Sequence, residues 1–403
     1  MLIKKINNRN ILFIYLSGFF GNGFFERAIF ILYLLDQGYT LLQIGFLQSL
    51  VNLAMFVFEI PTGIFADRFG RKNSLIFGRV LIMVYFVGMV FADHFSIVAA
   101  AFIALGIGVT FLSGTEEALL FDSAKKDGKE KDFTRIAGRY GAIITLILAI
   151  AMALGGYLKE ISWSTVFIVS IAFQVVATIL TLFIKEVEFD KPDEEEKRSF
   201  TYFLKETATF LRMNKASRML ILGIALFDGV ISIYLLFVQQ ILNEAGYAIF
   251  IISSISAVIT LISAFASDRA HVLENRFSPR IVLMVTVCFS AIFFLMIYSG
   301  VKVLLVVAFL GISLSYYLFA PVSNTLINME IPSEQRATLL SIMNFIASLI
   351  MFIFSPVIGF MAGEFGIEKF FAVAGSISML LAGVCIRYFF SGKRINKNTE
   401  VSG

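Results

Sequence analysis

Apolar residues occur along this chain in twelve long runs that are separated by short polar segments. A helix needs about 20 largely apolar residues to cross the hydrocarbon layer of a bilayer, so runs of this length predict membrane-spanning helices. The polar segments between them are too short for a separate soluble domain. The expected spans are residues 11–35, 43–66, 74–92, 96–121, 136–158, 163–184, 217–242, 247–267, 281–299, 303–328, 337–362 and 369–390.

The positive charges favour one orientation of these spans. Of the 33 Lys and Arg residues, 29 fall in stretches on the same side as the N-terminus, and Arg27 lies inside the first span. The other side holds only Lys159, Lys302 and Lys369. Because cytoplasmic loops carry the excess of Lys and Arg, the sequence predicts an all-α membrane protein with twelve transmembrane helices and both termini in the cytoplasm.

Composition supports a membrane protein. The chain is 58% hydrophobic and only 15% charged, whereas about a quarter of a soluble domain is charged. The net charge of +4 follows from the topology and gives no reason to expect nucleic acid as a partner. Cys288 and Cys385 fall within spans without metal or redox spacing, so we expect no cofactor and no metal. The first apolar run is too long for a cleaved signal peptide, and we expect a multi-pass protein of a bacterial plasma membrane.

The longest polar interruption divides the spans into two groups of six. Its segment FTYFLKETATFL has an apolar helical face, which predicts a helix on the inner membrane surface or against the helix ends, although a solvated tether is the alternative. The expected organisation is an N-terminal bundle at 1–184, a cytoplasmic linker at 185–216, a C-terminal bundle at 217–390 and a tail at 391–403.

The two halves resemble diverged copies. Asp67-Arg68 after the second span recurs as Asp268-Arg269 after the eighth, 201 residues later. Two six-helix repeats around a central cavity are an architecture for moving solutes by alternating access. We therefore expect a transporter.

The segment GIFADRFGRK, Gly63 to Lys72, carries charge between two apolar runs. It resembles the loop 2-3 signature of the major facilitator superfamily, G-x-x-x-D-R-x-G-R-K, with every specified position filled. A degenerate copy, SDRAHVLENRFSPR, occupies the corresponding loop of the second half and lacks the glycine and the Arg-Lys pair. The resemblance covers essentially the whole chain and implies a 6+6 helical transporter.

The same segment is suited to a conformational latch. Gly63 would allow close helix approach, and Asp67 would lie near the positive N-terminal end of the helix that begins near Arg336. Arg71 can pair with Asp67 and with Asp122, and the resemblance implies the same relay, which would hold the outward-open state. The alternative is that the basic residues only set the topology. The expected latch set is Gly63, Asp67, Arg68, Gly70, Arg71, Lys72, Asp122 and Arg336.

Other patterns of the superfamily are less complete. Drug/proton antiporters usually carry G-P-x-x-G-G in the fifth helix, where this chain keeps Gly155 and Gly156 but has Ala151-Met152 in place of Gly-Pro. An arginine usual in their fourth helix is also absent, with Thr110 near its place. These departures weaken the antiporter assignment.

Ionisable groups inside a membrane span are costly, which makes them candidates for function. A carboxyl group that a cavity alternately hydrates and dries can bind and release a proton, which is the chemistry of coupling. Glu116 and Glu117 lie about 100 degrees apart around a helix, so at most one faces a cavity squarely. The alternative is structural ion pairing. The expected proton-coupling or substrate residues are Glu26, Arg27 and Asp228 near mid-depth, and Glu59, Glu116 and Glu117.

The chain holds 45 Phe and one Trp, a composition that favours an aromatic or amphipathic ligand over a sugar. The leading hypothesis is a monomeric, proton-coupled exporter of small lipophilic or cationic compounds, with substrate, protons and the lipid bilayer as its partners. The alternative is a symporter or exporter of one metabolite such as a sugar, siderophore or peptide-like compound. An intramembrane enzyme is not expected because no nucleophile or metal set is visible, and without a P-loop ATP is not the expected energy source.

Overall fold

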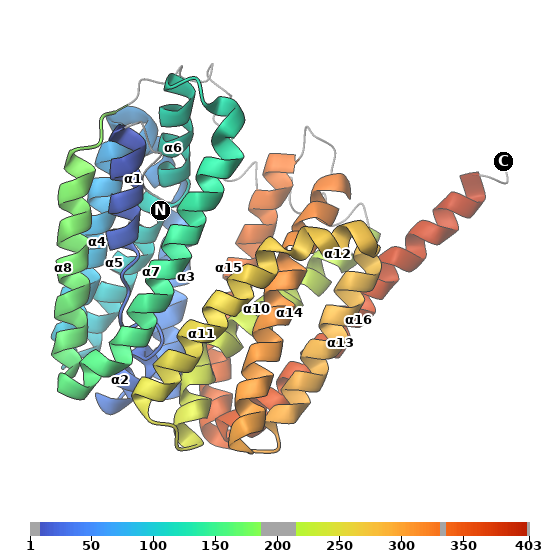
Figure 1. Ribbon diagram of the computed structural model, residues 1–403. Coiled ribbons are helices and arrows are strands. Elements are labelled where there is room, and N and C mark those ends of the chain that lie inside the picture. Colours follow the sequence, from blue (N-terminus) through green and yellow to red (C-terminus); the bar gives the residue numbers. More distant parts are fainter. Residues whose placement is uncertain (1–8, 187–214, 331–335, 401–403) are drawn as a thin grey trace. The chain divides into compact units, whose positions relative to one another are not determined.

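The computed structural model describes residues 9–186, 215–330 and 336–400, with the backbone alone for 217, 271, 274–275, 328–330, 336–348, 350 and 392–400. These described residues form helices joined by short turns and contain no strand (Figure 1). Most of the expected linker lies outside the described residues, and so does its predicted amphipathic helix.

Every expected span coincides with one helix or with two consecutive helices. Ten stretches of the described chain are long and apolar enough to cross a membrane. The number of crossings and the side on which the termini lie stay predictions. In the first half the helices are α1 (Arg9–Gly21), α2 (Phe30–Asp36), α3 (Leu41–Phe69), α4 (Arg71–Val90), α5 (Phe95–Leu112), α6 (Thr115–Lys126), α7 (Phe133–Ile161) and α8 (Trp163–Leu182), with a 3-10 turn, η1 (Glu130–Asp132), before α7. In the second half they are α10 (Lys215–Glu244), α11 (Ile249–Asp268), α12 (Ala270–Arg276), α13 (Pro279–Ile297), α14 (Lys302–Glu330), α15 (Arg336–Phe365) and α16 (Ile367–Glu400).

Two helix starts show how the sequence sets the boundaries. Thr40 and Gln43 form a capping box at the start of α3. The Thr40 hydroxyl accepts a hydrogen bond from the backbone N–H of Gln43 at 3.3 Å, and the side-chain oxygen of Gln43 accepts one from the backbone N–H of Thr40 at 2.9 Å. Ser162 caps α8 by accepting from the Thr165 amide at 3.1 Å. These bonds satisfy amide groups that would otherwise lack partners at a helix start.

The expectation of one continuous helix over 11–35 is wrong. α1 ends at Gly21, and the chain stays irregular until α2 begins at Phe30. Turn bonds replace the regular ladder here, such as Phe24 N–H to the Asn22 carbonyl at 3.0 Å and Ile29 N–H to the Glu26 carbonyl at 2.8 Å. The break places a polar stretch of backbone in the middle of an apolar run.

The span expected at 96–121 is also interrupted. α5 ends at Leu112, and Gly114 adopts a left-handed φ of 69° before α6 starts at Thr115. Glu116 and Glu117 therefore lie in the first turn of a new helix, where the helix dipole favours negative charge.

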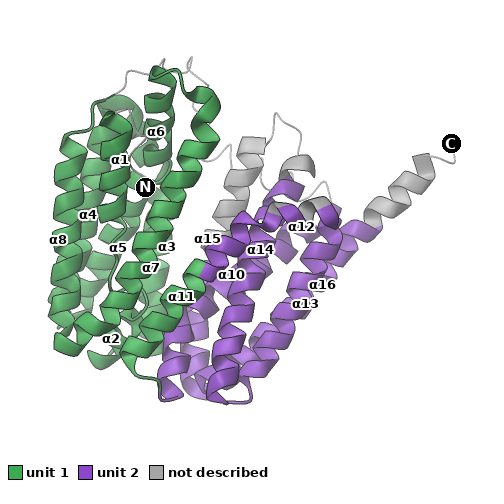
Figure 2. Ribbon diagram, viewed as in Figure 1, with its two compact units in different colours: residues 1–193, 247–261 green, residues 194–246, 262–403 purple. Residues whose placement is uncertain are grey.

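The chain forms two compact units, which Figure 2 colours separately. The first unit comprises residues 1–193 with 247–261, and the second unit comprises residues 194–246 with 262–403. The first half of α11 thus belongs to the unit formed by the N-terminal helices. The expected boundaries at 184, 216 and 390 stay predictions.

Candidate functional site

The break in the first span buries Glu26 inside the first unit. Its side chain is only 3% exposed, and its Oε2 atom has no hydrogen-bond partner in the described part of the chain. The neighbouring Arg27 is exposed. Gly155 of α7 packs against the Phe25 carbonyl so closely that a Cβ there would overlap it. The missing side chain on α7 therefore makes room for the irregular backbone next to Glu26.

Two buried polar side chains of α8 satisfy backbone groups that the break leaves without helical partners. The Gln174 amide donates to the Gly21 carbonyl at 2.7 Å, and the Ser170 hydroxyl accepts from the Phe25 amide at 3.4 Å. Both side chains are fully buried. The Gln174 Oε1 atom has no partner in the described chain. The break is thus held by specific bonds to α8, while one buried oxygen of Gln174 stays without a partner in the described chain.

Aromatic rings surround this break. Phe24 lies 5.4 Å from Phe86 of α4 between ring centroids, and Phe25 and Phe20 lie 4.9 and 5.2 Å from Phe173 of α8. Phe20 and Phe24 are only partly buried, so they leave ring surface accessible. A buried carboxyl beside aromatic faces is the combination that attracts an organic cation.

Arg79 of α4 is a functional candidate that the sequence analysis missed, because it was counted with the positive charges of the cytoplasmic stretches. Its side chain is fully buried. Its Nη2 atom pairs with Glu116 of α6 at 2.9 Å and donates to Ser17 of α1 at 3.3 Å, and its Nε atom donates to Thr181 of α8 at 3.2 Å. One guanidinium group therefore ties three other helices to α4.

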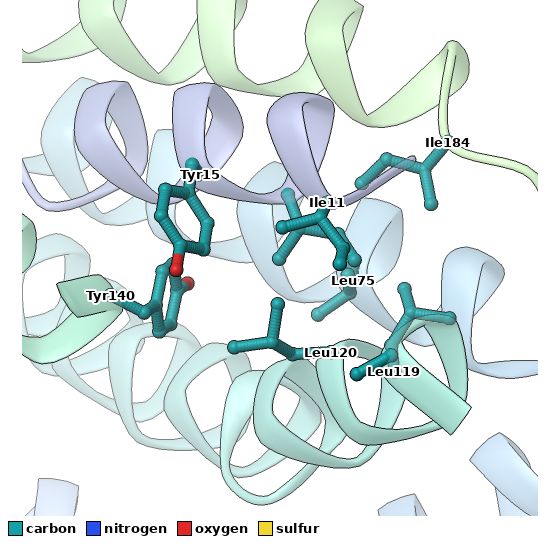
Figure 3. Packing of buried hydrophobic residues seen from close by; sticks show 9 residues of the cluster. Ile11, Tyr15, Leu75, Leu119, Leu120, Tyr140 and Ile184 are labelled. Carbon is teal, nitrogen blue, oxygen red and sulfur yellow. The ribbon is translucent and has the colours of Figure 1, made fainter. Parts of the chain in front are cut away.

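Tyr140 of α7 adds a fifth helix to this cluster. Its hydroxyl donates to the other Glu116 oxygen, Oε2, at 2.6 Å. Its ring lies 5.6 Å from that of Tyr15, and Figure 3 shows the two rings side by side in a core with residues of α1, α4 and α6. The Tyr15 hydroxyl donates in turn to the Ile136 carbonyl at 2.7 Å.

A signal for Arg79 was present in the sequence. The residue lies within the expected span at 74–92, where an unpaired guanidinium would be costly, and two carboxyl groups were available in the neighbouring span. Glu116 and Glu117 do point differently, since Glu116 enters the cluster and Glu117 is exposed. Glu59 of α3 is also exposed.

The latch segment contains the expected pair between Arg71, at the start of α4, and Asp122 of α6. Both side chains are largely buried. Asp67 is exposed, and Arg68 is exposed with its guanidinium 5.4 Å from the centre of the Phe69 ring. Within its unit Gly63 is exposed, and a Cβ there would meet no described atom within 4 Å. The latch function of these residues stays a prediction, and the side chain of Arg336 lies outside the described part of the chain.

Glu186, just after α8, is a second residue that the sequence analysis did not select. Its carboxylate accepts from the backbone amides of Arg71 and Lys72 at 2.8 and 2.9 Å. Lys72 also donates to the Leu182 carbonyl at 2.6 Å. Gly70 adopts a φ of 96°, and a Cβ there would lie 3.0 Å from the Glu186 carboxylate. A negative group therefore caps the positive end of α4.

Asp228 of α10 lies in the other unit. Its Oδ1 atom is buried and has no hydrogen-bond partner in the described chain. Tyr316 of α14 lies close enough to Asp228 for the two side chains to interact electrostatically. The adjacent Phe227 stacks on Phe319 with 3.8 Å between ring centroids. Asp228, like Glu26, therefore has one buried carboxyl oxygen without a hydrogen-bond partner in the described chain. Among the described residues, no group of three or more His, Cys, Asp or Glu side chains could hold a metal ion.

Comparison with known proteins identifies the family. The profile of the Major Facilitator Superfamily matches residues 11–272 and 270–402. The uncharacterized MFS-type transporter YxaM of Bacillus subtilis (strain 168) is 22% identical over 367 residues, which cover 86% of this chain and 87% of YxaM. The drug efflux pump JefA of Mycobacterium tuberculosis (strain ATCC 25618 / H37Rv) is 28% identical over 132 residues, which cover 32% of this chain and 25% of JefA.

A solved structure has a similar fold. The nucleoside transporter NupG superposes with a TM-score of 0.78 at 14% identity, and the match covers 94% of this chain and 99% of NupG. Identity this low shows a common fold alone. Since the family profile covers nearly all of the sequence, the chain is an integral membrane protein that belongs to the major facilitator superfamily of transporters.

Proposed function

We propose that this chain is a secondary active transporter that works by alternating access and exchanges protons for small lipophilic, cationic compounds, which it exports. The observation that carries the proposal is Glu26, a buried carboxyl group in the broken first span that forms no ion pair within the described chain. Its position at a helix discontinuity matches the binding sites of transporters built from repeats.

The chemistry of exchange follows from the cost of a buried charge. A carboxylate in an apolar site is unfavourable unless a counter-charge or a proton removes its unit charge. A proton and a cationic ligand therefore compete for Glu26, and each can displace the other. Competition for one group is sufficient to couple inward movement of protons to outward movement of the ligand.

Two further observations support a lipophilic cation. Phe20, Phe24 and Phe173 place aromatic rings at the break, where they offer contact area and cation–π attraction. The local similarity to a drug efflux pump also favours export.

A transporter of one polar metabolite is the second candidate. The buried Oε1 atom of Gln174 lacks a partner in the described chain, and a polar ligand could satisfy it through a donor group. A nucleoside transporter among the similar folds is compatible with this candidate without favouring it.

The test uses purified protein in proteoliposomes with an acidic interior and a fluorescent lipophilic cation, ethidium, outside. Protons that leave the lumen should drive the cation inward through the wild-type protein. Glu26→Gln should abolish this accumulation and weaken exchange of labelled for unlabelled cation, because the amide neither releases a proton nor supplies a negative charge to the cation. Glu130→Gln, which changes an exposed acid in η1, is the matched control and should accumulate the cation normally.

The results separate the candidates. Gradient-driven accumulation by Glu26→Gln at the wild-type rate would contradict the role of Glu26 and would make Asp228 the next carboxyl group to change. If the wild-type protein ignored ethidium but counterflow detected one polar compound from a nucleoside, sugar and peptide panel, the second candidate would replace the first.

A further inference from the structure

A cavity of about 420 Å³ lies in the first unit, at the end that carries the latch segment. It is bounded by the start of α1, the end of α6 and the residues that follow α8. Arg9, Lys126 and Lys185 supply three cationic side chains to its wall, one from each of these places, and all three are exposed. None of them forms an ion pair with a carboxylate of the described chain.

The two acidic residues of the same wall are already engaged. The Glu186 carboxylate accepts from two backbone amides at the start of α4. Asp127 pairs with Lys129 at 3.5 Å. Asn10 and Ser123, which also line the cavity, bond to each other at 2.8 Å. The cavity therefore has an excess of positive charge that its own acids do not balance.

An apolar surface adjoins this positive cavity. Phe183 lines the cavity, is 53% exposed and stacks on Phe13 with 5.5 Å between ring centroids. Along α8, an expected membrane span, Leu182, Ile179 and Val175 are exposed at spacings of three and four residues and so lie on one helical face. A positive cavity at the end of an apolar face matches a phospholipid, whose charged headgroup adjoins its acyl chains.

We propose that this cavity binds the phosphate-bearing headgroup of an anionic phospholipid, with the acyl chains lying along Phe183 and the exposed face of α8. Basic pockets between membrane helices bind anionic headgroups elsewhere because the phosphate gains several cationic partners at once. A free phosphate ion would satisfy the cations but would leave the apolar flank unused. The lipid is therefore the better match.

The bound lipid would connect elements that belong to the latch. The cavity joins α1, α6 and the segment after α8, and Glu186 in its wall caps α4 beside Arg71. Anionic lipid would hold these helix ends together, so the transporter would be more stable in membranes that contain it.

The test is native mass spectrometry of the full-length protein released from detergent, with dioleoyl phosphatidylglycerol titrated to resolve the first binding event. The triple variant Arg9→Gln/Lys126→Gln/Lys185→Gln should weaken this binding by about tenfold or more, because each lost cation near the membrane surface removes part of the attraction. The control Lys125→Gln/Lys131→Gln/Arg135→Gln removes the same charges from residues outside the cavity wall and should stay within about twofold of wild type. Thermal unfolding without added lipid verifies that both variants are folded.

Three results would overturn the proposal. Phosphatidylcholine that binds as tightly as phosphatidylglycerol would show that charge does not select the ligand. An equal loss in the control variant would show general attraction to basic loops. Displacement of the lipid by millimolar inorganic phosphate would assign the cavity to a soluble anion.

Discussion

Arg79 links more helices of the first unit than its position in a cytoplasmic stretch of positive charge would indicate. Its guanidinium bonds to Glu116, Ser17 and Thr181, and its Nη1 atom packs directly against Gly21, where α1 ends. A buried cation is stable only while its partners stay in place, since an unpaired charge in an apolar interior costs several kcal/mol. The cluster therefore ties the break in the first span to the break before α6.

Loss of the carboxylate from this cluster should destabilise the protein. Glu116→Ala leaves the buried Arg79 charge and the Tyr140 hydroxyl without their acceptor, and removing one member of a buried pair costs about 3 to 5 kcal/mol. Glu117→Ala, one residue further on at an exposed position, should change little. Thermal unfolding in detergent should show a large decrease in Tm for the first variant only. Equal Tm values for the two variants would mean that the cluster contributes little to stability.

The close contact at Gly21 gives a second test. A methyl group there would overlap the Arg79 guanidinium, so Gly21→Ala must displace one of the two groups, and overpacking of this kind costs about 1 to 3 kcal/mol. Gly138→Ala in α7 adds the same methyl group where no described atom lies within 4 Å. The control should leave Tm unchanged or raise it, because alanine favours helices. A normal Tm for Gly21→Ala would contradict a close contact between Gly21 and Arg79.

At the scale of elements, the ends of most long helices could be predicted from the sequence to within a few residues, because an apolar run long enough to cross a bilayer folds as a helix. The helix α16 is an exception, since it continues to Glu400, past the expected end at 390. The breaks could not be predicted from the mean hydropathy of a whole span, since the few polar and charged residues at each break, such as Glu26-Arg27 and Glu116-Glu117, are outweighed by the apolar residues on both sides. A local signal was present in Gly21-Asn22-Gly23 and in Ser113-Gly114, which are typical of turns. Both breaks would have been identified if these turn residues had been given more weight than the mean hydropathy of the span.

Glu186 makes a testable contribution to the start of α4. Its carboxylate holds the Arg71 and Lys72 amides, and a negative group at a helix N-terminus is worth about 0.3 to 1 kcal/mol at a surface. Glu186→Gln should therefore increase hydrogen exchange in a peptide covering residues 69–74, whereas Glu130→Gln should leave it unchanged. If hydrogen exchange in Glu186→Gln stayed at the wild-type level, water would be able to replace the carboxylate without destabilising the start of α4.

At the scale of the whole molecule, the family was accessible from the sequence, because the signature at 63–72 is a local pattern. The division into two six-helix bundles and the orientation expected from the charges stay predictions. The site was accessible only in part. Glu26 and Asp228 were selected for their depth in the membrane, but Arg79 and Glu186 act through partners 37 and 115 residues away in the chain. Such pairs depend on the packing of helices, which hydropathy does not specify.

The last prediction concerns the equilibrium between the two states of the transporter. If the Arg71–Asp122 pair holds the outward-open state, Asp122→Asn removes the negative charge that pairs with a largely buried arginine and should shift the population toward the inward-open state. A loss of about 1 kcal/mol is sufficient for a shift of about fivefold. Hydrogen exchange should then decrease at the end of the first unit opposite the pair, in peptides covering residues 36–41 and 91–95. Asp67→Asn should have the same effect, and Glu130→Gln, which changes an exposed acid in η1, should have none. Changes confined to the neighbourhood of residue 122 would show that the pair only stabilises the local structure, because a local loss cannot alter exchange at the opposite end.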